Sequence, residues 1–287
     1  MPTLREIKKR IRAVESTKQI TKAMEMVAAA RLRRAQQQIE SFRPYAVKMQ
    51  EMLSHLSEAS GTVEHPYFEE REVKKAILVV FTSDRGLCGS FNSNIIKRTN
   101  QWLAEHKDET PSLVLVGKKA WDYYKRRDVD VIARYQDFGG KMDMGKVREI
   151  TKDLSNKFVE HEVDRVSFVY TAFISIAKFR ISEMQFLPIK SDFAHSEGST
   201  AKEYIFEPDP SRIYKQLLPS YALVQVQMAL AESLASEHGT RMIAMGSATK
   251  NAGEMIDHLT LVRNKARQAT ITKELLDIVG GAEALNK

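Results

Sequence analysis

Two long amphipathic segments frame the chain, one at each end. In the first segment, apolar residues recur at alternating steps of three and four, the spacing of a helix that packs along one side. The positions on this stripe are Leu4, Ile7, Ile11, Val14, Lys18, Thr21, Glu25, Ala28, Leu32, Ala35, Ile39, Phe42, Ala46, Met49, Leu53 and Leu56. Only Lys18, Thr21 and Glu25 interrupt it. Beside them the apolar residues move one place earlier, to Ile20, Met24 and Val27, so we expect the seam to be curved or re-registered there.

The second segment repeats the pattern near the C-terminus. Its positions are Met245, Thr249, Ala252, Met255, Leu259, Val262, Ala266, Ala269, Lys273, Leu276 and Val279. At about 1.5 Å per residue, the first helix would span roughly 80 Å and the stretch from Ser220 onward roughly 100 Å. Neither stripe fits inside an ordinary domain of this size. The pattern therefore predicts that the two helices pair as an antiparallel coiled coil, connected by the residues between them.

The middle of the chain changes to an extended pattern. Residues 76–81 form a continuous apolar run, which is typical of a strand buried on both faces. Further short runs, at 113–116, 129–135, 166–170 and 181–187, alternate with helical stretches. This alternation predicts a doubly wound, mostly parallel α/β sheet with helices on both faces.

The predicted division has three parts. Residues 1–60 form the N-terminal helix of a coiled-coil shaft, residues 70–195 an α/β globular domain, and residues 208–287 the C-terminal helix of the shaft. Pro219 lies early in the last helix, so we expect a break or kink there.

Charge is concentrated at the start of the chain. The net charge is +7, and residues 1–34, with ten Lys or Arg and three Glu, carry all of it. Three interpretations stay open: a solvated basic face, an acidic protein partner, and binding to nucleic acid or anionic lipid. The absence of aromatic residues from this stretch weighs against the last. The start also lacks the apolar core of a signal peptide and no run is long enough for a membrane span, so we expect a cytoplasmic protein.

The sharpest local motif follows the first predicted strand, at Asp84, Arg85, Gly86, Cys88 and Gly89. A glycine-bearing turn between a strand and a helix is where α/β proteins bind phosphates, but this turn lacks both the dinucleotide and the P-loop spacing. We therefore interpret it as a structural turn, in which the glycines permit tight turns or close packing and Asp84 and Arg85 bond locally. Cys88, the single cysteine, is expected to be a packed thiol.

No catalytic constellation, metal site or cofactor site is predicted, which favours an interaction or mechanical role over catalysis. Two other classes stay open. One is a nucleotide-using α/β enzyme with helical extensions, which tight binding of ATP or NAD would support. The other is a coiled-coil protein that binds nucleic acid or lipid, which strongly salt-dependent binding would support.

Three segments resemble the gamma subunit of F-type ATP synthases: Ser16 to Ala29, Asp84 to Gly89 and Arg267 to Leu275. The resemblance runs from end to end in order and length, and includes Arg241 to Met245 and Asn264 to Arg267. It implies a bacterial, non-catalytic rotor subunit without a cofactor, whose paired helices form the central stalk inside a ring of three alpha and three beta subunits. The α/β domain would be a foot that rests on the membrane-embedded ring of c subunits and contacts epsilon.

The same resemblance implies a peripheral location on the cytoplasmic face of the cell membrane, with contact to the membrane only through the c ring and none with nucleic acid. The coupling ion, proton or sodium, stays open. The rotor would couple that ion's passage to ATP synthesis or hydrolysis because an asymmetric shaft meets three identical beta subunits differently.

By position in the family, specific residues receive expected roles. Arg267, Gln268 and Thr272 match residues that touch a beta-subunit loop, with Met24 on the facing helix at about the same level. Tyr204, Phe206 and Glu207 match the segment beside the c ring, and Leu275, Leu276, Ile278, Val279 and Leu285 would enter an apolar bearing at the top of the ring. Arg31, Arg33 and Arg34 form a basic face of the shaft, whose replacement by Gln is expected to alter torque or ADP inhibition but not assembly.

Overall fold

The computed structural model describes residues 3–60, 65–176, 178–189 and 210–285. In chain order the elements are α1 (Leu4–Ser60), η1 (Pro66–Phe68), β1 (Ala76–Phe81), α2 (Phe91–Glu105), η2 (Lys107–Glu109), β2 (Ser112–Val116), α3 (Lys118–Tyr124), β3 (Asp130–Tyr135), α4 (Met144–Val159), β4 (Arg165–Ser175), β5 (Lys178–Leu187) and α5 (Pro210–Leu285). The chain divides into two compact units. One consists of Met1–Ala28 with Met242–Lys287, and the other of Ala29–Arg241.

The central sheet lies in the second unit and has the strand order β3-β2-β1-β4-β5. The first four strands in this order are parallel, and β5 pairs antiparallel with β4. The predicted doubly wound, mostly parallel sheet is therefore confirmed. As the apolar run 76–81 indicates, every residue of β1 is buried.

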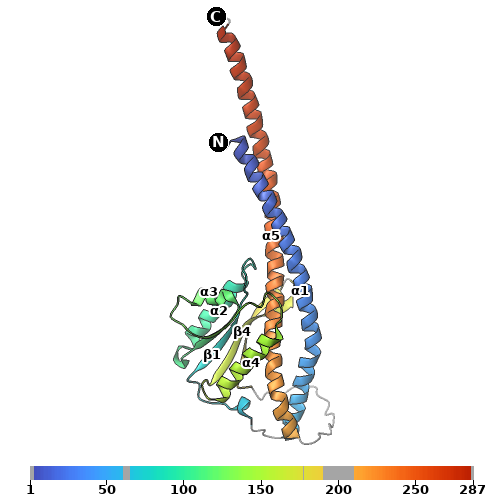
Figure 1. Ribbon diagram of the computed structural model, residues 1–287, viewed down its shortest axis with the longest axis vertical. Coiled ribbons are helices and arrows are strands. Elements are labelled where there is room, and N and C mark those ends of the chain that lie inside the picture. The colour runs from blue at the N-terminus through green and yellow to red at the C-terminus, as the bar shows by residue number, and fades with distance from the viewer. Residues whose placement is uncertain (1–2, 61–64, 177, 190–209, 286–287) are drawn as a thin grey trace. The chain divides into compact units, whose positions relative to one another are not determined.

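Helices cover both faces of this sheet (Figure 1). On one face, α2 and α3 bury Trp102 and Tyr124 against alternate residues of β1 and β2. On the other face, α4, the first turns of α5 and the end of α1 form the larger core. Successive residues of β1 point to opposite faces, so Leu78 and Val79 belong to different cores.

The two long helices are continuous over their whole lengths, 57 residues for α1 and 76 for α5. A capping box begins α1, because the Thr3 hydroxyl accepts from the Glu6 N–H while the Glu6 carboxylate accepts from the Thr3 N–H. Pro219 lies inside α5 without ending it, so a break there is excluded and a kink stays a prediction; Pro44 lies inside α1 in the same way.

The apolar stripe of α1 is buried at most of its predicted positions, from Ile7 and Ile11 to Leu53 and Leu56. The predicted shift around the polar interruption is confirmed at one position only. Met24 is half-buried, as are Thr21 and Glu25, whereas Ile20 and Val27 are exposed.

Candidate functional site

The first unit is an antiparallel helix pair with a fixed register. The Thr249 hydroxyl lies 2.9 Å from that of Thr21. One heptad apart on α5, Gly246 faces the Glu25 side chain and Gly253 faces that of Lys18. Positions that face each other in the pair therefore have residue numbers that sum to about 271. In this register the start of α1 lies level with about residue 267 of α5.

Beyond residue 267, α5 continues without α1 beside it, and residues 268–285 form its free end (Figure 1). At about 1.5 Å per residue this free end is roughly 27 Å long. Five of the large apolar side chains that the structure describes there are exposed by 48 to 68 %: Ile271, Leu275, Leu276, Ile278 and Val279. Leu285 is the last residue of α5. Exposed apolar side chains gathered on one bare helix indicate a surface that another protein covers.

The register corrects one expectation. Met24 lies level with about residue 247 of α5, so it is about 20 residues, or roughly 30 Å, from Arg267 along the helix and not at the same level. The two helices run antiparallel, so a residue about 20 positions after the start of α1 faces a residue about 20 positions before the free end of α5. Arg267, Gln268 and Thr272 are all exposed. They lie near the level of the first residue of α1, where the free end of α5 begins.

In the second unit, a buried ion pair ties α5 to the turn after β1. The Arg241 guanidinium is 8 % exposed and donates to the Glu237 carboxylate, one helical turn earlier, at 2.7 Å. Its other Nη donates to the carbonyl oxygens of Arg85 and Gly86, at 3.1 and 3.2 Å. Burial raises the pKa of Glu237, and the positive charge of Arg241 opposes that shift. We call Glu237, His238 and Arg241, with the backbone carbonyls that they hold, the latch.

His238 extends the latch to the loop after β3. Its Nε2–H donates to the Gly140 carbonyl oxygen at 2.9 Å, which leaves Nδ1 as an acceptor 3.4 Å from an Arg241 Nη. Burial lowers the pKa of His238 to about 4, so the ring is neutral near pH 7, as this donor and acceptor pattern requires. Arg31 of α1 donates to the neighbouring Gly139 carbonyl at 3.4 Å.

Asp84 holds the same loop from its other side. Its carboxylate accepts from the backbone N–H groups of Asp137, Phe138 and Gly139, at 2.8 to 3.2 Å, and from that of Lys118 at 3.2 Å. The loop thus turns its N–H groups toward a carboxylate and its carbonyls toward Arg31 and His238. Asp84 therefore bonds with residues far along the sequence, and the expectation of local bonding is wrong for it.

The turn after β1 departs from the sequence interpretation in a second way. The left-handed backbone belongs to Gly89 and Leu87, with φ of 59° and 62°. A Cβ at Gly86 would lie 3.9 Å from the Lys119 Cε, an ordinary van der Waals contact, and Gly86 contributes a carbonyl to the latch. Cys88 is buried, as expected of a packed thiol, and burial raises its pKa.

Asp84 also bears on the nucleotide interpretation. In an open α/β sheet, ligands bind at the carboxyl ends of the strands where the strand order reverses, which is here between β1 and β4. The N–H groups of the β3 loop and the first N–H of α3, which point toward this end of β1, already bind Asp84. These N–H groups are therefore already paired with a carboxylate and are not free to bind a phosphate.

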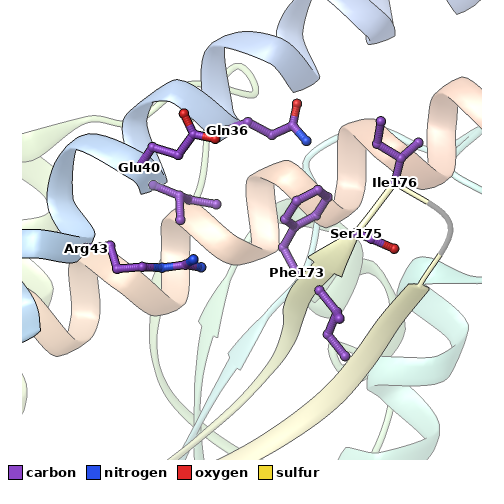
Figure 2. A pocket seen from close by; sticks show the side chains of 8 residues that line it. Gln36, Glu40, Arg43, Phe173, Ser175 and Ile176 are labelled. Carbon is purple, nitrogen blue, oxygen red and sulfur yellow. The ribbon is translucent and has the colours of Figure 1, made fainter.

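A surface hollow of about 550 Å³ lies elsewhere in the second unit, between α1 and the end of β4 (Figure 2). Ile39, Phe173 and Ile176 give it an apolar lining, and Glu40 and Arg43 come from α1. Figure 2 shows Arg43 reaching from the helix toward the end of the strand. Its lining as the structure describes it includes no histidine or cysteine, and its polar side chains are those of Gln36, Glu40, Arg43 and Ser175.

The remaining expected positions differ in what the structure says of them. Tyr204, Phe206 and Glu207 lie outside the described residues. Arg33 and Arg34 are exposed, whereas Arg31 is half-buried and bound to the β3 loop. Of the three arginines expected to form a basic face of the shaft, Arg33 and Arg34 are therefore the exposed ones.

Sequence reasoning missed Glu237 and His238 and gave Arg241 no role. The available signal was the presence of Glu, His and Arg within one helical turn of a segment otherwise lined by small and apolar residues. Charged residues are rarely buried unless they are paired, so such a group predicts a buried polar contact. Its partners, two backbone carbonyls and a loop, carry no sequence signature.

In the second unit the latch, Asp84 and Arg31 thus fix the β1 turn and the β3 loop to both long helices. Among the described residues, no helix has an apolar stretch long enough to cross a lipid bilayer. The second unit thus attaches the α/β domain rigidly to the long helices, and the first unit presents the exposed free end of α5.

Comparison with known proteins agrees with this arrangement. The family model described as ATP synthase matches residues 3–285. The ATP synthase gamma chain of Desulforamulus reducens is 46 % identical over 99 % of this chain and 100 % of its own length. That of Moorella thermoacetica is 43 % identical over the same shares.

Solved structures share the fold. One is a central stalk and c-ring structure of the Tetrahymena thermophila mitochondrial ATP synthase, with a TM-score of 0.61 and 24 % identity over 80 % of this chain and 99 % of that one. Another, from the Euglena gracilis mitochondrial ATP synthase, has a TM-score of 0.67 and 19 % identity over 98 % of this chain and 94 % of that one. Because the sequence match is full-length and well above 30 %, the chain belongs to the family of ATP synthase gamma chains.

Proposed function

We propose that this chain is the central-stalk rotor of a bacterial F-type ATP synthase. It stands inside a ring of three alpha and three beta subunits and couples ion flow through the c ring to ATP synthesis or hydrolysis by rotation. Nucleotide chemistry takes place on the other subunits, and this chain has no catalytic site of its own. It lies at the cytoplasmic face of the membrane as a peripheral subunit, with epsilon and the c ring at its foot.

The free end of α5 is the observation that carries this proposal. A single helix about 27 Å long with exposed Leu275, Leu276, Ile278 and Val279 gains stability only when other chains surround it. A smooth apolar sleeve suits this end, because aliphatic side chains slide past an apolar wall without breaking hydrogen bonds or ion pairs. Arg267, Gln268 and Thr272 lie at the base of the free end, where hydrogen bonds to a beta-subunit loop would report its angle.

The unequal lengths of the two helices support the coupling mechanism. Three chemically identical beta subunits surround a shaft that has two helices along part of its length and one along the rest. At any angle each beta subunit meets a different side of it. Rotation then shifts nucleotide affinities, because only differential contact can shift a conformational equilibrium.

The latch supports the transmission of torque in the same proposal. A foot that is turned by the c ring has to rotate α5 without slipping around it. Buried hydrogen bonds from Arg241 and His238 to the β1 turn and β3 loop resist such slippage, because turning would leave charged and polar groups unpaired in a buried place.

Reconstitution tests the proposal. The chain is mixed with alpha and beta subunits of the same organism, the assembled complex is isolated, and Mg-ATP hydrolysis is measured with and without the chain. We expect one copy per three alpha and three beta subunits, with sustained hydrolysis that requires it. Failure to join a competent alpha–beta ring would overturn the proposal.

The basic face is tested in the same complex. Because Arg31 has a structural hydrogen bond, we expect the double variant Arg33→Gln/Arg34→Gln to alter torque or ADP inhibition while the complex still assembles. Unchanged hydrolysis and rotation kinetics would discard a role for these two charges.

A further inference from the structure

The ends of β4 and β5 project beyond the rest of the sheet. β1 pairs with β4 only as far as the pair of Val80 and Val169. Beyond that point β4 continues to Ser175, and in the part of the chain that the structure describes it pairs there with β5 alone. A two-stranded ribbon has little stability by itself. We call residues 170–175 with 178–182 the hairpin; its open edge needs partners other than a strand.

Side chains of α5 take the place of the missing strand. The Ser236 hydroxyl donates to the Thr171 carbonyl oxygen at 3.1 Å. One helical turn earlier, the Glu232 carboxylate accepts from the Phe173 N–H. Because Thr171 and Phe173 are two residues apart, their backbone groups face the same edge of β4. Two polar side chains of α5 therefore satisfy part of this edge.

Gly239 continues the same face of α5. Glu232, Ser236 and Gly239 are spaced by four and three residues, so they lie on one side of the helix. An added Cβ at Gly239 would lie 2.8 Å from the ring of Phe179 in β5. The ring therefore packs directly against the backbone of α5, and α5 lies against both strands of the hairpin.

The Glu232 carboxylate also faces three titratable side chains on other elements. Arg43 of α1 and Arg180 of β5 face it, and their positive charges favour its ionised form. Tyr170 of β4 faces it as well; burial raises the pKa of Tyr170, and the charge of Glu232 adds to that rise. Figure 2 shows the Arg43 side chain reaching from α1 toward the end of β4. One carboxylate of α5 thus interacts with α1, β4 and β5.

Stability alone does not account for this carboxylate. Burial raises the pKa of Glu232 even with both arginines near, so the folded state favours its protonated form. Arg43 and Arg180 are exposed, and exposed ion pairs contribute little to the free energy of unfolding. What the carboxylate supplies is specificity of placement, because it fixes where the hairpin lies relative to α5 and α1.

We propose that Glu232 is a positioning residue of the rotor, whose carboxylate holds the hairpin to α5 and to Arg43 of α1, so that the sheet and the parts of both helices in the second unit turn as one body. This proposal rests on the proposed rotor function. It goes beyond the latch, which fixes the β1 turn and the β3 loop. Glu232 acts through the hairpin and Arg43, so its loss should affect the coupling of hydrolysis to ion pumping more than hydrolysis itself.

A neutral substitution tests the proposal in the complete ATP synthase in membrane vesicles. Glu232→Gln keeps the size of the side chain and an acceptor for the Phe173 N–H, but it removes the attraction to Arg43 and Arg180. Mg-ATP hydrolysis and ATP-driven ion pumping are measured on the same vesicles. We expect the hydrolysis rate of the parent and a loss of pumping per ATP hydrolysed. Glu40→Gln, which removes a carboxylate from the same hollow, is the matched control and should pump as the parent does.

The action through Arg43 gives a second measurement. Arg43→Gln should lower pumping per ATP in the same way, and the double variant Glu232→Gln/Arg43→Gln should lose no more than one single variant, because the two side chains act as a pair. Arg43 is exposed, so its variant tests the pair even where Glu232→Gln fails to fold. At the hairpin itself, hydrogen exchange of the Phe173 amide should become roughly tenfold faster in Glu232→Gln, because a neutral acceptor replaces a charged one.

The pH dependence of pumping gives a readout that a loss of folding would not. As the pH falls, Glu232 takes up a proton and its attraction to Arg43 and Arg180 is lost, so pumping per ATP by the parent should approach that of Glu232→Gln, whose own ratio should change less. Equal pumping per ATP in the parent and in both single variants at neutral pH would overturn the proposal and leave the rotor function intact. Failure of the parent chain to assemble would instead refute the rotor function itself.

Discussion

Replacing Arg241 by Gln should destabilise the α/β domain strongly. The change removes the 2.7 Å partner of Glu237, whose side chain is only 7 % exposed, and the donor to two turn carbonyls. Removing one partner of a buried ion pair costs about 3–5 kcal/mol. In the variant, Glu237 can take up a proton in place of remaining a buried unpaired charge. This limits the electrostatic share of the loss to about 4 kcal/mol, the cost of neutralising a carboxyl of ordinary pKa at pH 7. We therefore expect a loss of about 3–5 kcal/mol in the free energy of unfolding.

Urea denaturation followed by tryptophan fluorescence measures this loss, because both tryptophans, Trp102 and Trp121, lie in the α/β domain. Arg34→Gln, an exposed arginine in the same unit, is the matched control and should change the stability by less than about 0.5 kcal/mol. The double variant Glu237→Gln/Arg241→Gln leaves no unpaired charge and should lose less than Arg241→Gln alone.

The pH dependence gives an independent signature. Burial raises the folded-state pKa of Glu237, so its protonated form favours folding and stability is lost as the pH rises through that pKa. Without Arg241 the pKa rises further, and the deficit of Arg241→Gln relative to the parent should therefore grow from acid toward neutral pH. A deficit no larger than that of Arg34→Gln, or one independent of pH, would refute the reasoning.

Three further expectations concern the latch and the free end of α5. Burial lowers the pKa of His238 to about 4, so the folded state favours the neutral ring, and the free energy of unfolding should fall by about 3 kcal/mol as the pH drops from about 6.5 through 4. His238→Gln should abolish that part of the acid dependence, as measured by urea denaturation. Gly140→Ala should cost about 1–3 kcal/mol, because φ is 73° and the new methyl would lie 2.9 Å from the His238 ring, whereas Gly139→Ala, with φ of 63° and open space, should cost less by thermal denaturation. Leu276→Asp, on the free end, should leave the stability of the isolated chain within about 0.5 kcal/mol and yet lower sustained ATP hydrolysis by the assembled complex; unchanged hydrolysis would remove the bearing role.

The fold was largely predictable because its signals are local and periodic. The run 76–81 could only be a strand buried on both faces, and the three-and-four spacing from Leu4 to Leu56 required a long helix with one covered side. The strand order was not predicted, since nothing in β4 indicates that it lies beside β1 and not at an edge. Pro219 does not break α5, because a proline's local cost of about 3 kcal/mol is outweighed by the tertiary packing of this helix.

The functional contacts were less predictable, because they join backbone atoms to side chains far away in the sequence. Asp84 looked like a local turn residue, yet its four donors lie 34 to 55 residues later. The register of the helix pair depends on which residue of α5 faces Thr21, and the stripes alone allow several alignments. Gly246 and Gly253 settle it, since glycines opposite Glu25 and Lys18 accommodate long side chains on the seam.

The contact between Thr21 and Thr249 spans 228 residues of sequence. During synthesis at about 5–20 residues per second, the seam of α1 therefore waits roughly 10–45 s for its partner to leave the ribosome. The α/β domain, whose strands are close in sequence, can fold within that interval. The last step of folding is then the packing of the C-terminal part of α5 against α1, which was synthesised first. A nascent chain arrested before that point carries an open apolar stripe, which makes α1 the segment of this protein that most needs a chaperone.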